Sequence, residues 1–126
     1  MTAEATLAIC KAEWADARLR HGDIANPAMQ KLAHFTDAFL ASDHALDAFR
    51  AGWSIEQLFG MRRDGGQACG LICLAALGAI EIDRFDEAGV WLRPAGEIDT
   101  PISYQPKDFP VDGAVPWWQQ DVPLAH

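Results

Sequence analysis

The fold is decided by residues 53–78, which read WSIEQLFGMRRDGGQACGLICLAALG. Ser54 is typical of a helix N-cap, and Gln57 stands three residues later, where its side chain can complete a capping box. Trp53 and Leu58 occupy the two positions of a hydrophobic staple around the same helix start. The sequence therefore predicts that a short helix begins directly after Ser54.

The second half of this stretch repeats the capping pattern and leads into an apolar run. Asp64 and Gln67 are again an N-cap residue and its partner three residues later. Residues 68–80 carry no charge, which is typical of a helix that is buried on all sides. We therefore predict a central buried helix over residues 65–77, in which Gly70 marks a close approach of another backbone segment.

Two longer helices are predicted before this stretch. In the first, over residues 3–20, apolar residues recur at spacings of three and four. Its stripe consists of Leu7, Cys10, Trp14 and Ala17. The second, over residues 27–51, opens with Asn26 as N-cap and Pro27 at the first helical position. Its heptad-like stripe consists of Leu32, Phe35, Phe39, Ser42, Leu46, Phe49 and Trp53.

After the apolar run, the hydrophobic period changes from that of a helix to two residues. Isoleucines alternate with acidic residues from Ile80 onward, and turn residues recur between the apolar segments. We predict three antiparallel strands, over residues 79–84, 89–93 and 98–104. Pro101 places the last of these strands at a sheet edge.

These segments together predict a single α+β domain over residues 1–126. Its helices cover residues 3–20, 27–51, 55–59 and 65–77. They pack against the three-stranded meander. Residues 105–126 are expected to form an extended, irregular tail, because five of the seven prolines stand from Pro101 onward. This tail nevertheless holds Trp117 and Trp118.

The same core also carries a resemblance to other proteins. Trp53, then Leu58-Phe59-Gly60, then Gly70-Leu71 and a hairpin that ends at Tyr104 resemble the core of a group of small uncharacterised bacterial proteins. The resemblance covers about residues 30–104. It implies the helix-and-hairpin core, and it implies no activity.

Composition predicts a soluble, folded domain. Half of the residues are hydrophobic and 22% are charged, which argues against disorder. The longest uncharged run is shorter than the ~20 residues of a membrane helix. Acidic Glu4 and Glu13 are not compatible with the basic start of a signal peptide. Three cysteines, an odd number, indicate reduced thiols, so we expect a cytoplasmic protein.

The net charge of −8 lies mostly in the last third of the chain. Residues 80–126 hold nine acidic residues against three basic ones, whereas residues 1–79 hold nine against seven. A nucleic-acid binder needs clustered lysine and arginine, and only Arg62 and Arg63 resemble a cluster. The charge therefore argues against direct nucleic-acid binding, and it favours a protein partner with a basic surface.

The sequence contains no complete catalytic, metal or cofactor motif. Residues 67–70 resemble the caspase nucleophile signature, with His21 48 residues before Cys69, but Leu71 replaces the glycine that should follow. Cys69 is predicted at a helix N-terminus, which can make a thiol reactive, so a small cysteine-dependent enzyme is an alternative. Cys69 and Cys73 share a helix face without a second pair of ligands, so we expect neither a metal nor a cofactor.

Two sets of residues are candidates for binding a partner. Trp117 and Trp118 stand in the proline-rich tail, where an exposed ring can anchor an interface. The alternative is that these rings cover the domain's own core. Asp83, Asp86 and Glu87 form the acidic part of the first hairpin, where they can steer a basic partner.

We therefore expect a small acidic protein that acts by binding another protein and not as an enzyme. One version is an anti-CRISPR-like inhibitor or accessory factor from a phage or mobile element. It would act on a nucleic-acid-handling defence complex by imitating the charge of nucleic acid. A host regulatory or assembly subunit is a second version. A third is a structural homodimer that forms through the stripe of residues 32–53.

Overall fold

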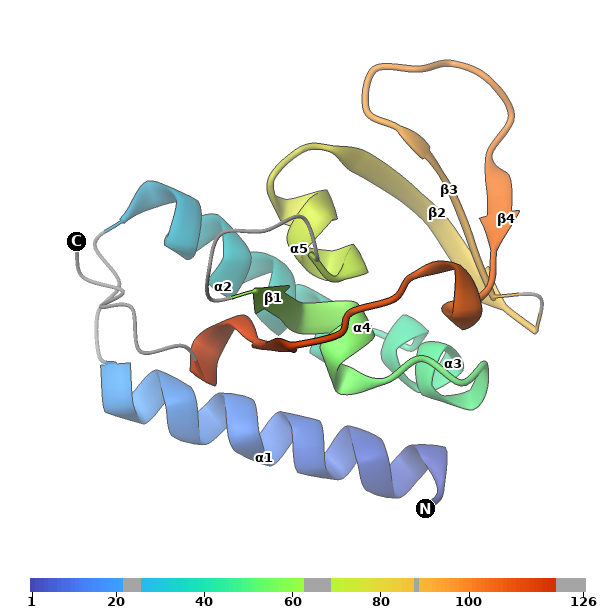
Figure 1. Cartoon of the computed structure of the whole chain (residues 1–126). Helices are drawn as coiled ribbons and strands as arrows, with labels where there is room; N and C mark the ends of the chain where they lie inside the picture. The colour runs from blue at the N-terminus through green and yellow to red at the C-terminus, as the bar shows by residue number, and fades with distance from the viewer. Residues whose placement is uncertain (22–25, 63–68, 88, 120–126) are drawn as a thin grey trace.

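The computed structural model describes residues 1–21, 26–62, 69–87 and 89–119. These residues form the predicted α+β fold, in which α-helices make up a body and an antiparallel β-meander packs against one side of it (Figure 1). In the part of the chain so described, no helix combines the length and the apolar character needed to cross a membrane.

The first two helices begin where the sequence predicts. α1 (Ala3–His21) buries the stripe residues Cys10, Trp14 and Ala17. α2 (Pro27–Ala41) starts behind Asn26, whose side-chain oxygen accepts hydrogen bonds from two backbone N–H groups in the first turn, at 2.9 and 3.3 Å. The predicted cap is therefore confirmed, and it satisfies N–H groups that a helix start would otherwise leave unpaired.

The prediction of one helix over residues 27–51 is wrong, because two helices, α2 and α3 (His44–Arg50), occupy this range. Ser42 ends α2: its backbone N–H and its hydroxyl both donate to the carbonyl oxygen of Phe39, at 3.1 and 2.7 Å. The stripe residues Leu32, Phe39, Phe49 and Trp53 are buried within the chain. Phe35 of the same stripe is 41% exposed. The homodimer through this stripe stays a prediction.

The short helix α4 (Ile55–Phe59) confirms the capping box. The backbone N–H of Gln57 donates to the Ser54 hydroxyl oxygen at 3.1 Å, and the Ser54 N–H donates to the Gln57 side-chain oxygen at 2.9 Å. The Gln57 amide nitrogen also donates to the carbonyl oxygens of Pro106 and Phe109, at 2.7 and 3.3 Å. The cap residue thus connects α4 to a segment about fifty positions later in the chain.

The central helix is shorter than predicted. α5 (Leu71–Ala76) begins after Gly70, and Cys69 pairs with Met61 in an isolated β-bridge instead of lying in the first turn of the helix. The predicted Asp64–Gln67 cap lies outside the described residues. The close approach at Gly70 is confirmed, because a Cβ there would lie 2.5 Å from the carbonyl of Leu58.

The meander has the predicted order of antiparallel strands, β2 (Ile80–Asp86), β3 (Gly89–Pro94) and β4 (Ile102–Tyr104). β4 begins later than predicted, so that a loop of residues 95–101 projects from the end of the sheet (Figure 1). A β-bulge between Ile82 and Arg84 changes the alternation of side chains along β2. Ile82 and Phe85 consequently both face the core.

The C-terminal segment is not the irregular tail that the prolines predict. Its strand β5 (Ala114–Pro116) pairs antiparallel with β1 (Gly60–Arg62), between the 3-10 turns η1 (Pro106–Asp108) and η2 (Trp117–Gln119). The described part of this segment, up to Gln119, runs across the helical body and reaches α1 at η2 (Figure 1). It therefore closes the core.

Candidate functional site

Trp117 and Trp118 are part of the core, so the expectation that one ring is exposed as an anchor is wrong. Their exposed fractions are 2% and 0%. The Trp118 ring lies 5.1 Å from Phe59 and 5.3 Å from Trp14, measured between ring centroids. The Trp117 indole N–H donates to the buried hydroxyl of Thr36 at 3.1 Å. The alternative, in which these rings cover the domain's own core, describes the structure.

The acidic residues of the first hairpin lie at and beside the end of β2. Arg84 stands between two of them, with nitrogen–oxygen distances of 2.6 Å to Asp83 and 3.6 Å to Asp86. Asp86 also accepts a hydrogen bond from the Trp91 indole N–H at 2.6 Å. The structure therefore brings Asp83 and Asp86 together, but it compensates their charge with Arg84. Glu87 follows in the turn and is exposed.

The outer face of the sheet is a network of paired side chains. Arg84 and Trp91 are partners across β2 and β3, and the guanidinium carbon lies 4.7 Å from the centre of the Trp91 ring. Glu81 and Arg93 are also cross-strand partners and form an ion pair at 3.1 Å. The acidity that the sequence predicts for the hairpin is therefore partly neutralised on this face.

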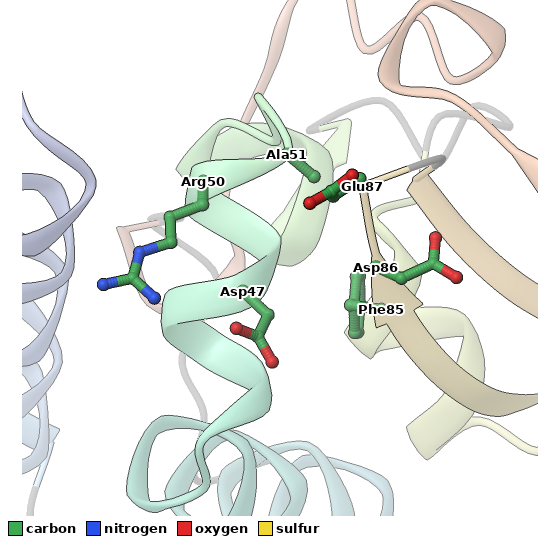
Figure 2. A pocket seen from close by; sticks show the side chains of 6 residues that line it. All are labelled: Asp47, Arg50, Ala51, Phe85, Asp86 and Glu87. Atoms are coloured by element: carbon green, nitrogen blue, oxygen red, sulfur yellow. The ribbon is translucent and has the colours of Figure 1, made fainter.

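A groove of about 520 Å³ lies between α3 and the end of β2. Its lining residues are Asp47, Arg50, Ala51, Phe85, Asp86 and Glu87 (Figure 2). The residues from α3 and the turn that follows it are spaced i, i+3 and i+4, which places them on one face of a helix. The bulge in β2 turns Phe85 toward the core, where the residue is buried and forms an apolar wall of the groove.

The charges in this groove do not cancel. Figure 2 shows that the Arg50 side chain turns away toward α1, where its guanidinium lies 3.0 Å from a carboxylate oxygen of Glu4. Asp86 turns to the opposite side, toward Trp91, whereas the carboxylates of Asp47 and Glu87 lie in the space between α3 and β2. Within the described ranges, neither Asp47 nor Glu87 forms an ion pair.

The Arg50–Glu4 pair explains why Arg50 does not neutralise the groove. The pKa of Glu4 is lowered, first by a backbone hydrogen bond and then by the side-chain hydrogen bond from Arg50. The short distance between Arg50 and Glu4 and the lowered pKa of Glu4 both place the positive charge of Arg50 at the surface of α1. The groove therefore presents two carboxylates beside an apolar wall, a combination that suits a long cationic side chain with an apolar stem.

The thiols give no support to cysteine chemistry. Burial raises the pKa of Cys10 and of Cys73 to about 12, so both thiols are protonated near neutral pH. Cys69 is half-buried and lies outside helix α5, contrary to the prediction. The side chain of His21 and residues 67–68 of the caspase-like signature lie outside the described residues. Among the residues placed by the structure, no three histidine, cysteine or acidic side chains gather as metal ligands.

Sequence reasoning found two residues of this groove, Asp86 and Glu87, and missed the residues from α3. The sequence predicts one long helix for Asp47 and Arg50, and nothing in its pattern indicates that these residues face β2. The only available signal is Ser42-Asp43, a pair that favours helix ends and could have indicated a separate α3. The contact between α3 and β2 itself joins segments more than thirty residues apart, which no local pattern encodes.

Comparisons with protein-family models, with curated proteins and with solved structures find no match to this chain. The resemblance to small bacterial proteins stays a prediction.

Proposed function

We propose that this protein is a protein-binding module, and that the groove between α3 and β2 receives a basic side chain of its partner. The observation that carries the proposal is the pair of carboxylates, Asp47 and Glu87, that lie in the groove without an ion pair from a described residue. Asp86 extends the acidic lining, although it is already bound to Arg84 and Trp91.

The geometry suits lysine or arginine. The aliphatic stem of either side chain would pack on Phe85 and Ala51, and its cationic end would lie beside the two carboxylates. Hydrogen bonds between ionised groups are shorter and stronger than neutral ones, so this contact would fix the orientation of the partner. The net charge of −8 would also attract a basic surface before contact.

The acidic surface supports two versions of this function. In the first, the protein is an inhibitor that occupies the basic groove of a nucleic-acid-handling complex in place of the nucleic acid. In the second, it is a regulatory or assembly subunit of a host complex. Both use the same contact and differ in the identity of the partner, which affinity capture followed by mass spectrometry would provide.

The test is a comparison of tagged baits in the native cell. The first bait is the unaltered protein, and the second carries Asp47→Lys and Glu87→Lys. The control bait carries Asp16→Lys and Asp112→Lys, which change the net charge equally at exposed positions outside the groove. We expect the unaltered and control baits to capture the same protein and the groove bait to lose it. Equal capture by all three baits would contradict the proposal.

A further inference from the structure

The end of the sheet opposite the acidic groove is apolar and exposed. The three large hydrophobic residues exposed in this region are Leu77, Ile98 and Ile102. Ile98 is 98% exposed, at the projecting loop between β3 and β4 (Figure 1). An exposed apolar group of this kind costs solubility, and when polar residues surround it, it commonly marks an interaction surface.

Ile102 is the cross-strand partner of Leu92, which lines a hollow of about 660 Å³. Ile98 lines a second hollow, together with Glu81 and Arg93. The lining residues of the first hollow are Ala79, Ile80, Leu92, Pro94, Ser103, Tyr104, Asp108 and Phe109. Ala79 and Pro94 belong both to the exposed end of the sheet and to this first hollow, and a backbone hydrogen bond of 3.1 Å from Ala95 to Ala79 holds this end together. We call this region, with Leu77, Ile98 and Ile102, the apolar end.

The floor of the hollow is fixed by the core. The Phe109 ring lies 5.5 Å from Trp53 and 5.7 Å from Tyr104, measured between ring centroids. The carbonyl of Phe109 is held by the Gln57 side chain at 3.3 Å. A surface that is already ordered loses little conformational entropy when it binds, which favours affinity.

The rim of the apolar end is acidic. Glu97 and Asp99 flank Ile98, and Asp108 lines the hollow. Arg93 lines the second hollow, beside Ile98, but is paired with Glu81, and Lys107 is the only basic residue between Pro94 and Asp112. A second copy of the chain would bring the same acidic rim and repel the first, and the anionic surface of a membrane would be repelled too. The charge therefore selects a basic partner.

We propose that the apolar end binds an amphipathic, basic segment of a protein partner. Apolar side chains of that segment would fill the hollow and cover Ile98 and Ile102, and its lysine or arginine residues would meet Glu97 and Asp99. The proposal rests on the function proposed above, since it assigns a second contact to a basic partner. It concerns the opposite end of β2, so the two contacts can be removed separately.

The experiment uses a synthetic helical peptide as the probe, with leucine on one face and lysine on the other. One comparison peptide carries glutamate in place of lysine, and another carries serine in place of leucine. Amide shifts of the isotope-labelled protein are followed by NMR during titration. We expect the leucine–lysine peptide to shift residues 77–80, 92–104 and 109, and both comparison peptides to bind at least tenfold more weakly.

Variants separate this proposal from the proposed function. Ile98→Ser with Ile102→Ser should weaken binding of the leucine–lysine peptide at least tenfold. Leu19→Ser, at an 85% exposed leucine of α1, should leave the affinity for this peptide unchanged. Shifts confined to the groove residues 47–51 and 85–87 would overturn the inference and leave the proposed function standing. Equal binding of the glutamate peptide, or a dimer in sedimentation that Ile98→Ser dissociates, would also overturn it.

Discussion

At the scale of single residues, the tryptophans show why a sequence near the C-terminus cannot be assigned to surface or core by composition alone. Trp14, Trp117 and Trp118 are packed together with centroid distances of 5.1 to 6.0 Å. Proline-rich sequence around the last two predicts an open segment, but their large apolar rings are stabilised by burial. Burial of the rings decides the path of the segment here.

Trp118→Ala should lower the free energy of unfolding by about 3–5 kcal/mol, because it leaves a large cavity at a fully buried position. Urea unfolding followed by circular dichroism measures this loss. Leu19→Ala is the control, since that leucine is 85% exposed, and it should change the stability by less than about 0.5 kcal/mol. A loss below about 1 kcal/mol for Trp118→Ala would show that the ring is peripheral.

The buried thiols predict a dependence of stability on alkaline pH. Burial raises the pKa of Cys10 and Cys73 from 9.0 to about 12, so above pH 9 the unfolded chain loses thiol protons that the folded chain keeps. Their contribution to stability is therefore complete below pH 9 and declines as the pH rises toward 12. Cys73→Ala should make this decline shallower in urea titrations between pH 8 and pH 11. An unchanged slope would contradict the burial of that thiol.

At the scale of elements, the structure shows which helix starts and helix ends are encoded by nearby residues. The caps at Asn26 and Ser54 lie where the sequence predicts them, because each depends on residues within three positions. The sequence pattern does not reveal the end of α2 at Ser42, because the apolar stripe continues from α2 into α3. The pairing of β1 with β5 was missed as well, because two three-residue strands more than fifty positions apart leave no periodic signal.

The hydrogen bonds around the capping box of α4 predict which of two substitutions lowers the stability more. Ser54→Ala should cost about 0.5–2 kcal/mol, because it removes one cap hydrogen bond. Gln57→Ala should cost more than Ser54→Ala, because it removes the return bond to Ser54 and also the bonds to Pro106 and Phe109. Thermal unfolding of both variants measures the order. If Ser54→Ala is the more damaging, Gln57 does not hold the C-terminal segment.

At the scale of the whole molecule, the C-terminal segment joins the helical body to the meander. It contacts α4 through Gln57, pairs with β1, and places Trp117 and Trp118 against α1 and α2. The two ends of the sheet differ: one forms the acidic groove with α3, and the other carries the apolar end. The general acidity of the meander could be predicted from the sequence. The groove and the apolar end, which we propose as two contacts for a partner, could not, because they depend on how α3 and η1 pack against β2–β4.

Removal of residues 113–126 should abolish the cooperative unfolding transition, because it deletes β5 and the buried rings of Trp117 and Trp118. Calorimetry of the shortened chain measures this loss. A synthetic peptide of residues 113–126, added in excess, should restore the transition if it docks in place of the missing segment. A cooperative transition in the shortened chain alone would show that the segment is not part of the core.

The central claim is that a basic partner contacts the meander and α3, and amide hydrogen exchange with and without the captured partner tests it most directly. Exchange slows where backbone hydrogen bonds are protected by a bound protein. The account predicts slower exchange in residues 44–51 and 80–87, with a weaker effect when salt is raised because the contact is electrostatic. Slower exchange confined to α1 and residues 105–119, unaffected by salt, would contradict it.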